Sequence, residues 1–130
     1  MNDQQNYYEA KLKYEIDSWD LNECLNKNDE IIVIDTRSGQ AFAQEHIPTS
    51  INIPHREMNI ESTKKLDKNK LYITYCDGIG CNASTKGALN MTKLGFKVKE
   101  LLGGIDWWKR DGHETHGVES KTVNKINCGC

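Results

Sequence analysis

The chain has 130 residues, 37% of them hydrophobic, and a formal net charge of -2. This length suits one domain built around a single hydrophobic core. Acidic and basic residues are interleaved, so the chain lacks the basic stripe with which nucleic-acid-binding proteins neutralise phosphates. No apolar run approaches the roughly 18 residues that span a bilayer, and the polar N-terminus is unlike a secretory signal. These features predict a cytoplasmic protein that binds neither nucleic acid nor a membrane.

The patterns of the first half predict six elements. In chain order these are a helix over 3–12, a short strand over 13–16, a helix from Ser18 capped by Asp17, a strand over 31–35, a short helix capped by Ser38 and a strand over 51–53. The run IIVID at 31–35 is typical of a strand that is buried on both faces. It therefore favours a parallel sheet.

The second half predicts a strand, LYITYC, that ends at Cys76, and then a glycine-bearing loop that leads into a helix over 83–94. A strand over 98–102 and a helix over 105–110 follow. Strands that alternate with helices imply right-handed βαβ crossovers and a mainly parallel sheet with helices on both faces. We expect a helical extension over 1–12 and the domain itself over 13–116. The sequence after Gly112 has no apolar periodicity, which predicts a mobile tail, with 117–130 outside the domain.

Five cysteines are present, and in a reducing compartment an odd number favours thiols over a disulfide framework. They are Cys24, Cys76, Cys81, Cys128 and Cys130. Cys24 shares a helical face with Leu21 and Leu25, which predicts a core position. The terminal pair, Cys128 and Cys130, has no flanking ligands to complete a four-coordinate site, so we expect no metal and no other cofactor.

Cys76 has the strongest signal for chemistry. In parallel sheets ligands bind beyond the carboxyl ends of strands, which is where this residue lies. Backbone N–H groups and the positive end of the following helix dipole favour an anion there and lower the pKa of a thiol. Gly78 and Gly80 allow positive φ, so that consecutive amides can converge on the sulfur. A buried structural cysteine fits the same local pattern, and that pattern alone leaves both interpretations open.

Three segments widen the context: IDTRSGQAFAQEHIPTSINIP, YCDGIGCNAS and LLGGIDWWKRDG. In order and spacing they resemble the three signatures of the rhodanese domain, over residues 14–115. The resemblance implies a rhodanese-like α/β fold and a sulfurtransferase. In that family a cysteine, here Cys76, accepts a sulfane sulfur as a persulfide and passes it to a nucleophilic acceptor such as a thiol, cyanide or a protein. The loop that cradles the sulfur aligns with Asp77, Gly78, Ile79, Gly80, Cys81 and Asn82.

Three further residues align with positions that mostly brace the scaffold in this family: Asp35, Arg37 and His46. We interpret them as structural, since a buried acid, base and imidazole at turns usually satisfy one another and nearby backbone groups. Trp107 and Trp108 predict one ring in the core and one at the surface. His113 and His116 are expected to face solvent.

The loop departs from the family pattern, because it is longer than the usual form and lacks arginine. Asp77 and Asn82 stand where positive charge would help to bind thiosulfate, and an acid beside the thiolate opposes its ionisation. A protein or low-molecular-weight persulfide donor is therefore favoured. Cys81 is either a loop filler or a second thiol that attacks the Cys76 persulfide, and oxidation is expected to join the two cysteines.

Two other functions remain as alternatives. Cys-dependent phosphatases and arsenate reductases of related fold use an arginine that grips the oxyanion bidentately, but Asn82 stands six residues after Cys76 and lacks the charge and the fork. A non-catalytic binding module is the other alternative, which the intact cysteine and the glycine-rich loop disfavour. The oligomeric state is left open by the sequence.

Overall fold

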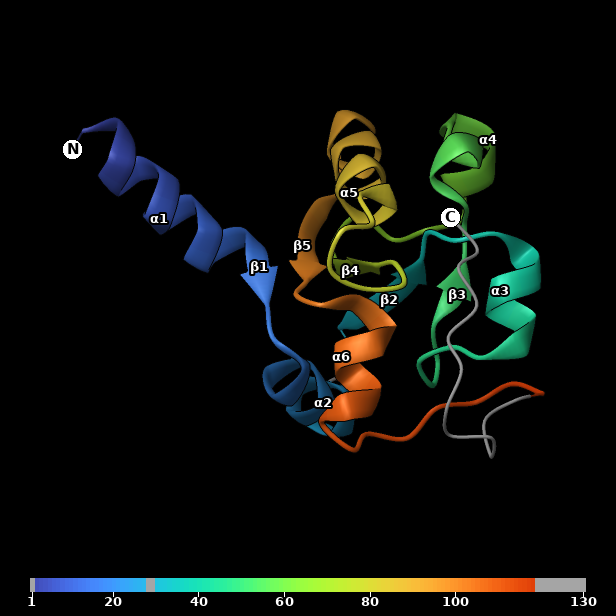
Figure 1. Ribbon diagram of the computed structural model, residues 1–130. Coiled ribbons are helices and arrows are strands. Elements are labelled where there is room, and N and C mark those ends of the chain that lie inside the picture. The colour runs from blue at the N-terminus through green and yellow to red at the C-terminus, as the bar shows by residue number, and fades with distance from the viewer. Residues whose placement is uncertain (1, 28–29, 119–130) are drawn as a thin grey trace.

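The computed structural model describes residues 2–27 and 30–118. Its elements, in chain order, are α1 (Asp3–Tyr14), β1 (Glu15–Ile16), α2 (Ser18–Lys27), β2 (Ile31–Asp35), α3 (Gly39–Gln44), β3 (Ile51–Asn52), the short 3-10 helix η1 (His55–Glu57), α4 (Ile60–Thr63), β4 (Leu71–Tyr75), α5 (Ala83–Lys93), β5 (Lys97–Leu101) and α6 (Gly104–Arg110). The strands of this part of the chain form one sheet in the order β1-β5-β4-β2-β3, and each neighbouring pair is parallel (Figure 1). The predicted α/β class with a central parallel sheet is confirmed.

Two hydrophobic clusters, one on each face of the sheet, hold the helices in place. Val33 and Ile73 belong to a cluster that includes Trp108 of α6, whereas their neighbour Ile34 belongs to a second cluster with Met91 of α5. Successive side chains of a strand point to opposite faces, so one buried run supplies both clusters. Helices α2 and α6 therefore cover one face of the sheet and α5 covers the other (Figure 1).

Local capping explains where the first helices begin. In α1, the Asn2 side chain accepts from the Gln5 amide at 2.9 Å and the Gln5 side chain accepts from the Asn2 amide at 3.2 Å, so the helix starts with a capping box. It continues to Tyr14, and the strand predicted over 13–16 is reduced to two residues that pair with β5. Asp17 accepts from the Asp20 amide at 2.8 Å, as expected for the cap of α2.

Helix α1 projects from the β1 edge of the sheet (Figure 1). Among the described residues it buries no side chain, and its large apolar side chains Tyr7, Tyr8, Leu12 and Tyr14 are all exposed. None of the helices in the described chain is long and apolar enough to cross a membrane.

The prediction of a mobile tail after Gly112 is wrong for residues 113–118. His116 forms an antiparallel bridge with His46, and the indole of Trp108 donates to the Glu114 carbonyl at 2.8 Å. The ring of His113 lies against Trp19 and Trp108, so it does not face solvent as expected. These contacts are local hydrogen bonds and ring packing, which leave no periodic pattern in the sequence. The remaining tail, with Cys128 and Cys130, lies outside the described residues.

Asp35 and Arg37 form the buried ion pair that the sequence analysis expects. The Arg37 guanidinium donates to both carboxylate oxygens of Asp35, at 2.8 to 3.2 Å, and to the Glu45 carbonyl at 2.6 Å. Its remaining terminal nitrogen donates to Asp77 at 3.1 Å. One side chain therefore connects the end of β2, the end of α3 and the loop after β4.

The ionisation of this network is fixed by its surroundings. Burial opposes the charge of Arg37, but the hydrogen bonds and charge of Asp35 outweigh it and hold the pKa of Arg37 above its ordinary value. Burial, and then Asp35, raise the pKa of Tyr75, so its hydroxyl stays protonated and donates to Asp35 at 2.7 Å. His46 is not part of the network. Its Nδ1 lies 2.7 Å from the Phe42 carbonyl and its ring stacks on Phe42.

We predict that Arg37→Met lowers the free energy of unfolding by about 3–5 kcal/mol, because it leaves the Asp35 carboxylate buried without its main partner. Urea denaturation of reduced protein measures this change. Arg110→Met, which removes an exposed ion pair with Asp106, is the matched control and should cost less than about 1 kcal/mol. Equal losses in the two variants would contradict the role assigned to Arg37.

Candidate active site

Cys76 lies at the carboxyl end of β4, next to the end of its neighbour β2. It directly follows β4, and the register of β2 with β4 pairs Asp35 with Tyr75, so the chain after both strands emerges at one edge of the sheet. The amide and the hydroxyl of Thr36 donate to the Tyr75 carbonyl at 3.0 and 2.7 Å. Cys76 itself is 2% exposed. The predicted position beyond a carboxyl strand end is therefore observed.

The first turn of α6 holds the backbone of this residue. The amide of Ile105 donates to the Cys76 carbonyl at 3.0 Å, and the amide of Asp106 donates to the Asp77 carbonyl at 2.8 Å. Gly104 lies beside these bonds with φ +59, and a Cβ at this position would stand 2.4 Å from the Cys76 carbonyl oxygen. The close approach of α6 to the loop therefore requires glycine.

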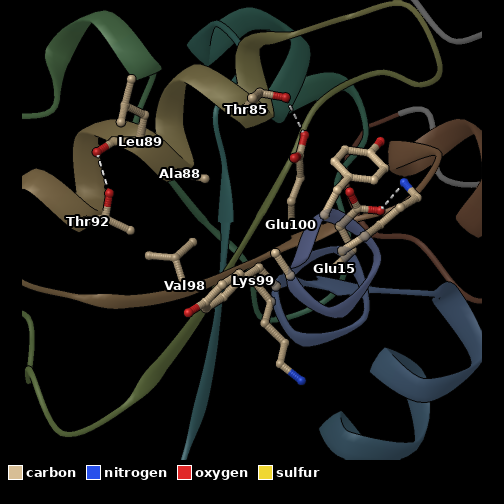
Figure 2. A pocket seen from close by; sticks show the side chains of 12 residues that line it. Glu15, Thr85, Ala88, Leu89, Thr92, Val98, Lys99 and Glu100 are labelled. Atoms are coloured by element: carbon tan, nitrogen blue, oxygen red, sulfur yellow. Dashed lines mark hydrogen bonds and ion pairs between the residues drawn. The ribbon is translucent and has the colours of Figure 1, made fainter. Parts of the chain in front are cut away.

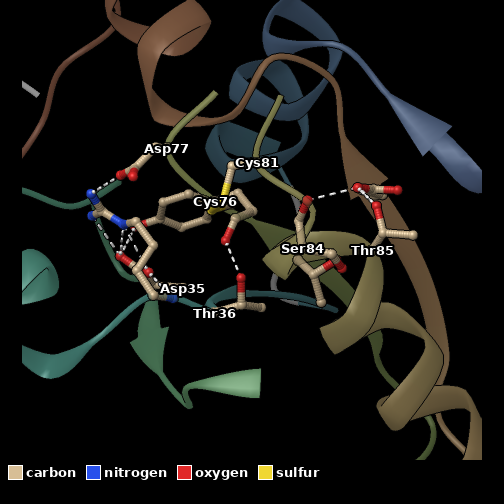
Figure 3. The surroundings of a disulfide bond; sticks show 11 residues. Asp35, Thr36, Cys76, Asp77, Cys81, Ser84 and Thr85 are labelled. Atoms are coloured by element: carbon tan, nitrogen blue, oxygen red, sulfur yellow. Dashed lines mark hydrogen bonds and ion pairs between the residues drawn. A yellow bond between two sulfur atoms is a disulfide. The ribbon is translucent and has the colours of Figure 1, made fainter. Parts of the chain in front are cut away.

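Cys76 and Cys81 are joined by a disulfide, with their Cα atoms 6.3 Å apart (Figure 3). Gly80 adopts φ +95 and the Cys81 amide donates to the Gly78 carbonyl at 3.2 Å, so the loop turns back over its own start. This is the pairing expected for the oxidised protein. The interpretation of the cysteines as thiols is wrong for these two in this structure, whereas Cys24 is free and half-buried. Gly78 does not use positive φ as predicted, and it packs against Asp106 instead.

A pocket of about 250 Å³ opens beside the disulfide. Four of the six loop residues predicted to bind substrate contribute to its wall: Gly78, Ile79, Gly80 and Cys81. Ser84 and Thr85, from the first turn of α5, lie on another side. Asn82 is exposed at the start of α5 and is not part of the pocket wall among the described residues. The pocket thus brings the two sulfurs and the N-terminus of α5 together.

Asp77 turns away from this pocket and toward Arg37 (Figure 3). Its side chain is 12% exposed, and the ion pair with Arg37 at 3.1 Å compensates much of its charge. Asp77 is therefore not the uncompensated acid beside the thiolate that the sequence predicted. A carboxylate oxygen of Asp77 still lies within 4.8 Å of both sulfurs. Together with this carboxylate, Cys76 and Cys81 could bind a thiophilic metal only if both were thiolates, and in the disulfide neither is.

Glu100 of β5 is a pocket residue that the sequence analysis missed. Its carboxylate accepts from the hydroxyls of Ser84 and Thr85 at 2.6 and 2.7 Å, at the first turn of α5 (Figure 3). A fixed negative charge there offsets the positive end of the helix dipole. Glu15 and Lys11, which form an ion pair at 2.7 Å, complete this side of the pocket. No pattern within β5 distinguishes Glu100 from an ordinary exposed strand residue.

A second, larger hollow of about 520 Å³ adjoins the disulfide pocket (Figure 2). It lies between α1 and the surface formed by α5 and β5, and Leu89 and Val98 contribute apolar walls. Four residues belong to the walls of both hollows: Lys11, Glu15, Thr85 and Glu100. Because α1 forms one wall, the groove exists only if this exposed helix keeps its place.

The fold is that of the rhodanese class of proteins. A family model of the Rhodanese-like domain matches residues 19–111, and the chain belongs to this family. Among curated proteins, the thiosulfate sulfurtransferase GlpE of Coxiella burnetii is 30% identical over 96 residues, which cover 72% of this chain and 82% of that protein. A sulfurtransferase of Allochromatium vinosum is 29% identical over 98 residues, covering 75% and 90%.

Solved structures agree with this assignment. The BH2092 protein of Bacillus halodurans has 41% sequence identity and a TM-score of 0.89, with 97% of this chain and 92% of that chain covered. A rhodanese-related protein of Thermoplasma volcanium has 28% identity and a TM-score of 0.68, covering 79% and 97%. The rhodanese-like fold expected from the sequence signatures is confirmed.

We predict that Gly104→Ala lowers the free energy of unfolding by more than about 3 kcal/mol, because the added Cβ meets the Cys76 carbonyl in a conformation that already disfavours L side chains. Gly112→Ala is the matched control: Gly112 also has positive φ, +88, but no described atom lies within 4 Å of the added Cβ. It should cost about 1–2 kcal/mol, from backbone strain alone. Equal thermal denaturation midpoints for the two variants would contradict the close approach of α6 to the loop.

Proposed function

We propose that the protein is a sulfurtransferase in which Cys76 accepts a sulfane sulfur as a persulfide and passes it to a nucleophilic acceptor. The observation that carries the proposal is the position of Cys76 at the carboxyl end of β4, in a pocket that also contains the first turn of α5. Membership of the Rhodanese-like domain family and the names of the curated relatives support sulfur transfer. The reaction starts from the reduced protein, because a thiolate is the attacking species.

The charges around the pocket favour persulfide donors over thiosulfate. Glu15 and Glu100 outnumber the single described cation of the wall, Lys11. Thiosulfate carries two negative charges and meets no arginine among the described wall residues, whereas a low-molecular-weight or protein persulfide presents its sulfur with less charge. We infer a persulfide donor and a thiol or protein acceptor. We place the protein in the reducing cytoplasm, which supplies both low-molecular-weight and protein thiols.

The two alternatives have less support. Phosphatase or arsenate reductase chemistry needs an arginine that faces the oxyanion, and the guanidinium of Arg37 is engaged by Asp35, Asp77 and the Glu45 carbonyl. Asn82, in the position of the phosphatase arginine, is exposed at the start of α5. A pure binding module would have no use for a buried cysteine whose carbonyl is held by the first turn of α6.

We predict that reduced protein gains a sulfur, about 32 Da, at Cys76 when it meets a sulfane donor, because the loop and the helix N-terminus stabilise the sulfur anion. Intact-mass analysis after incubation with glutathione persulfide, thiosulfate or a cysteine-desulfurase donor measures the gain. Cys76→Ser should lose both loading and transfer, while Cys24→Ser, which alters a free cysteine outside the pocket, should load like the parent. Full transfer activity in Cys76→Ser would refute the mechanism.

We predict that Glu100→Gln raises kcat/KM for thiosulfate by about five-fold, equivalent to roughly 1 kcal/mol, because it removes a negative charge while an amide can still accept from Ser84 and Thr85. Asn82→Arg should act in the same direction. Glu61→Gln, which neutralises an exposed acid on α4, is the control and should leave the value unchanged. A gain of equal size with an uncharged persulfide donor would show that charge is not the cause.

A further inference from the structure

We propose that the protein has a second activity, the reductive release of sulfide from its own persulfide, with Cys81 as the resolving thiol. The inference rests on the proposed function, because it begins from sulfur bound to Cys76. It differs in the fate of that sulfur, which leaves as HS⁻ instead of passing to an acceptor. The electrons come from the thiols of Cys76 and Cys81, which form a disulfide. A small or protein dithiol then reduces this disulfide and regenerates the two thiols.

The geometry that carries the inference is the disulfide itself. The turn closed by Gly78 and the Cys81 amide returns the chain over Cys76, and Gly80 provides the positive φ that this turn needs. The Cα separation of 6.3 Å lies inside the range that a disulfide requires without movement of the backbone. The same position that allows the bond places the Cys81 sulfur next to the inner sulfur of a Cys76 persulfide.

The chemistry balances with these two residues alone. The Cys81 thiolate attacks the Sγ of Cys76–S–SH, the bond between that Sγ and the outer sulfur breaks, and the outer sulfur departs as HS⁻. The sulfane sulfur gains two electrons and becomes sulfide, while the two cysteines lose two electrons and become the disulfide. An external dithiol then reduces the disulfide and is itself oxidised to a cyclic or protein disulfide.

The electrostatics of the pocket favour this step. The Cys81 thiolate that attacks the protonated persulfide places a negative charge beside Glu100 of the pocket wall. Formation of the disulfide removes this charge from the pocket, because it leaves with HS⁻. The acidic wall therefore destabilises the loaded state relative to the released one.

The exposure of the loop suits the reductant. Cys76 is buried, whereas Cys81 is only half-buried and follows Ile79, which is 83% exposed, and the exposed Gly80. A dithiol can therefore reach the Cys81 sulfur first. Cys76 then leaves as the thiolate, and the lower the pKa of a leaving thiol the faster it leaves.

A single-turnover experiment tests the inference without any added reductant. Fully reduced, thiol-free protein is mixed anaerobically with about one equivalent of glutathione persulfide, and sulfide and intact mass are followed together. The parent chain should release close to one sulfide per molecule and end about 2 Da lighter than its reduced form, with Cys76 bonded to Cys81. Cys81→Ser and Cys81→Ala should remain about 32 Da heavier and release less than about a tenth of that sulfide. Cys24→Ser should behave like the parent.

The outcomes separate this inference from the proposed function. A parent protein that keeps the added sulfur, or Cys81 variants that release sulfide as fast as the parent, would overturn the resolving role and leave the sulfurtransferase intact. If neither the parent nor any variant that retains Cys76 accepted sulfur from the donor, both the resolving role and the proposed sulfurtransferase function would be overturned. Because sulfide and disulfide are measured in the parent chain, the result does not depend on the folding of the variants.

Discussion

The buried guanidinium of Arg37 is the constraint on which the site depends. A charge in the interior is stable only when its donors are satisfied, and the three groups that satisfy this one come from β2, from the end of α3 and from the loop after β4. The ion pair with Asp35 therefore does more than stabilise one turn. Through Asp77 it sets the direction in which the chain leaves Cys76, and so it orients the loop that ends at Cys81.

The loop is held by hydrogen bonds at its start and is exposed further along. At Cys76 the carbonyl is held by the first turn of α6, and Gly104 allows a backbone approach that no side chain would permit. From Ile79 to Gly80 the chain is exposed, and it returns only through the turn at Cys81. A nucleophile benefits from a fixed position, whereas a resolving thiol must approach it and withdraw. The two halves of the loop fit these two demands.

The sequence was sufficient to predict the sheet, the position of Cys76 and the buried pair of Asp35 and Arg37. The sheet and the position of Cys76 follow from local patterns, a β-branched run and a cysteine at the end of a strand. The structural role of Asp35 and Arg37 was expected from the resemblance to the rhodanese signatures. The partner of Asp77 could not be predicted in this way, because Arg37 lies forty residues earlier and meets it only after β2 pairs with β4. Because Asp77 follows Cys76 in the sequence, its carboxylate was expected to oppose ionisation of the thiol. In the folded chain, the ion pair with Arg37 compensates much of this charge.

The positions of Glu100 and of residues 113–118 also depend on tertiary contacts that no local sequence pattern predicts. Glu100 faces the first turn of α5 because β5 lies beside β4, a relation that depends on strand order and not on any motif. His113 is held by Trp19 and Trp108, residues from two helices that are distant in the chain.

Two features of the loop between Cys76 and α5 bear on the proposed persulfide. Asn82, which carries no charge, stands at the exposed start of α5. Residues 78–81 supply the turn that brings Cys81 onto Cys76. A nearby cation would favour the persulfide anion over the protonated persulfide, which is the form that the resolving thiolate attacks. In the proposed mechanism, the uncharged Asn82 and the second cysteine therefore act in one direction: both shorten the life of the persulfide.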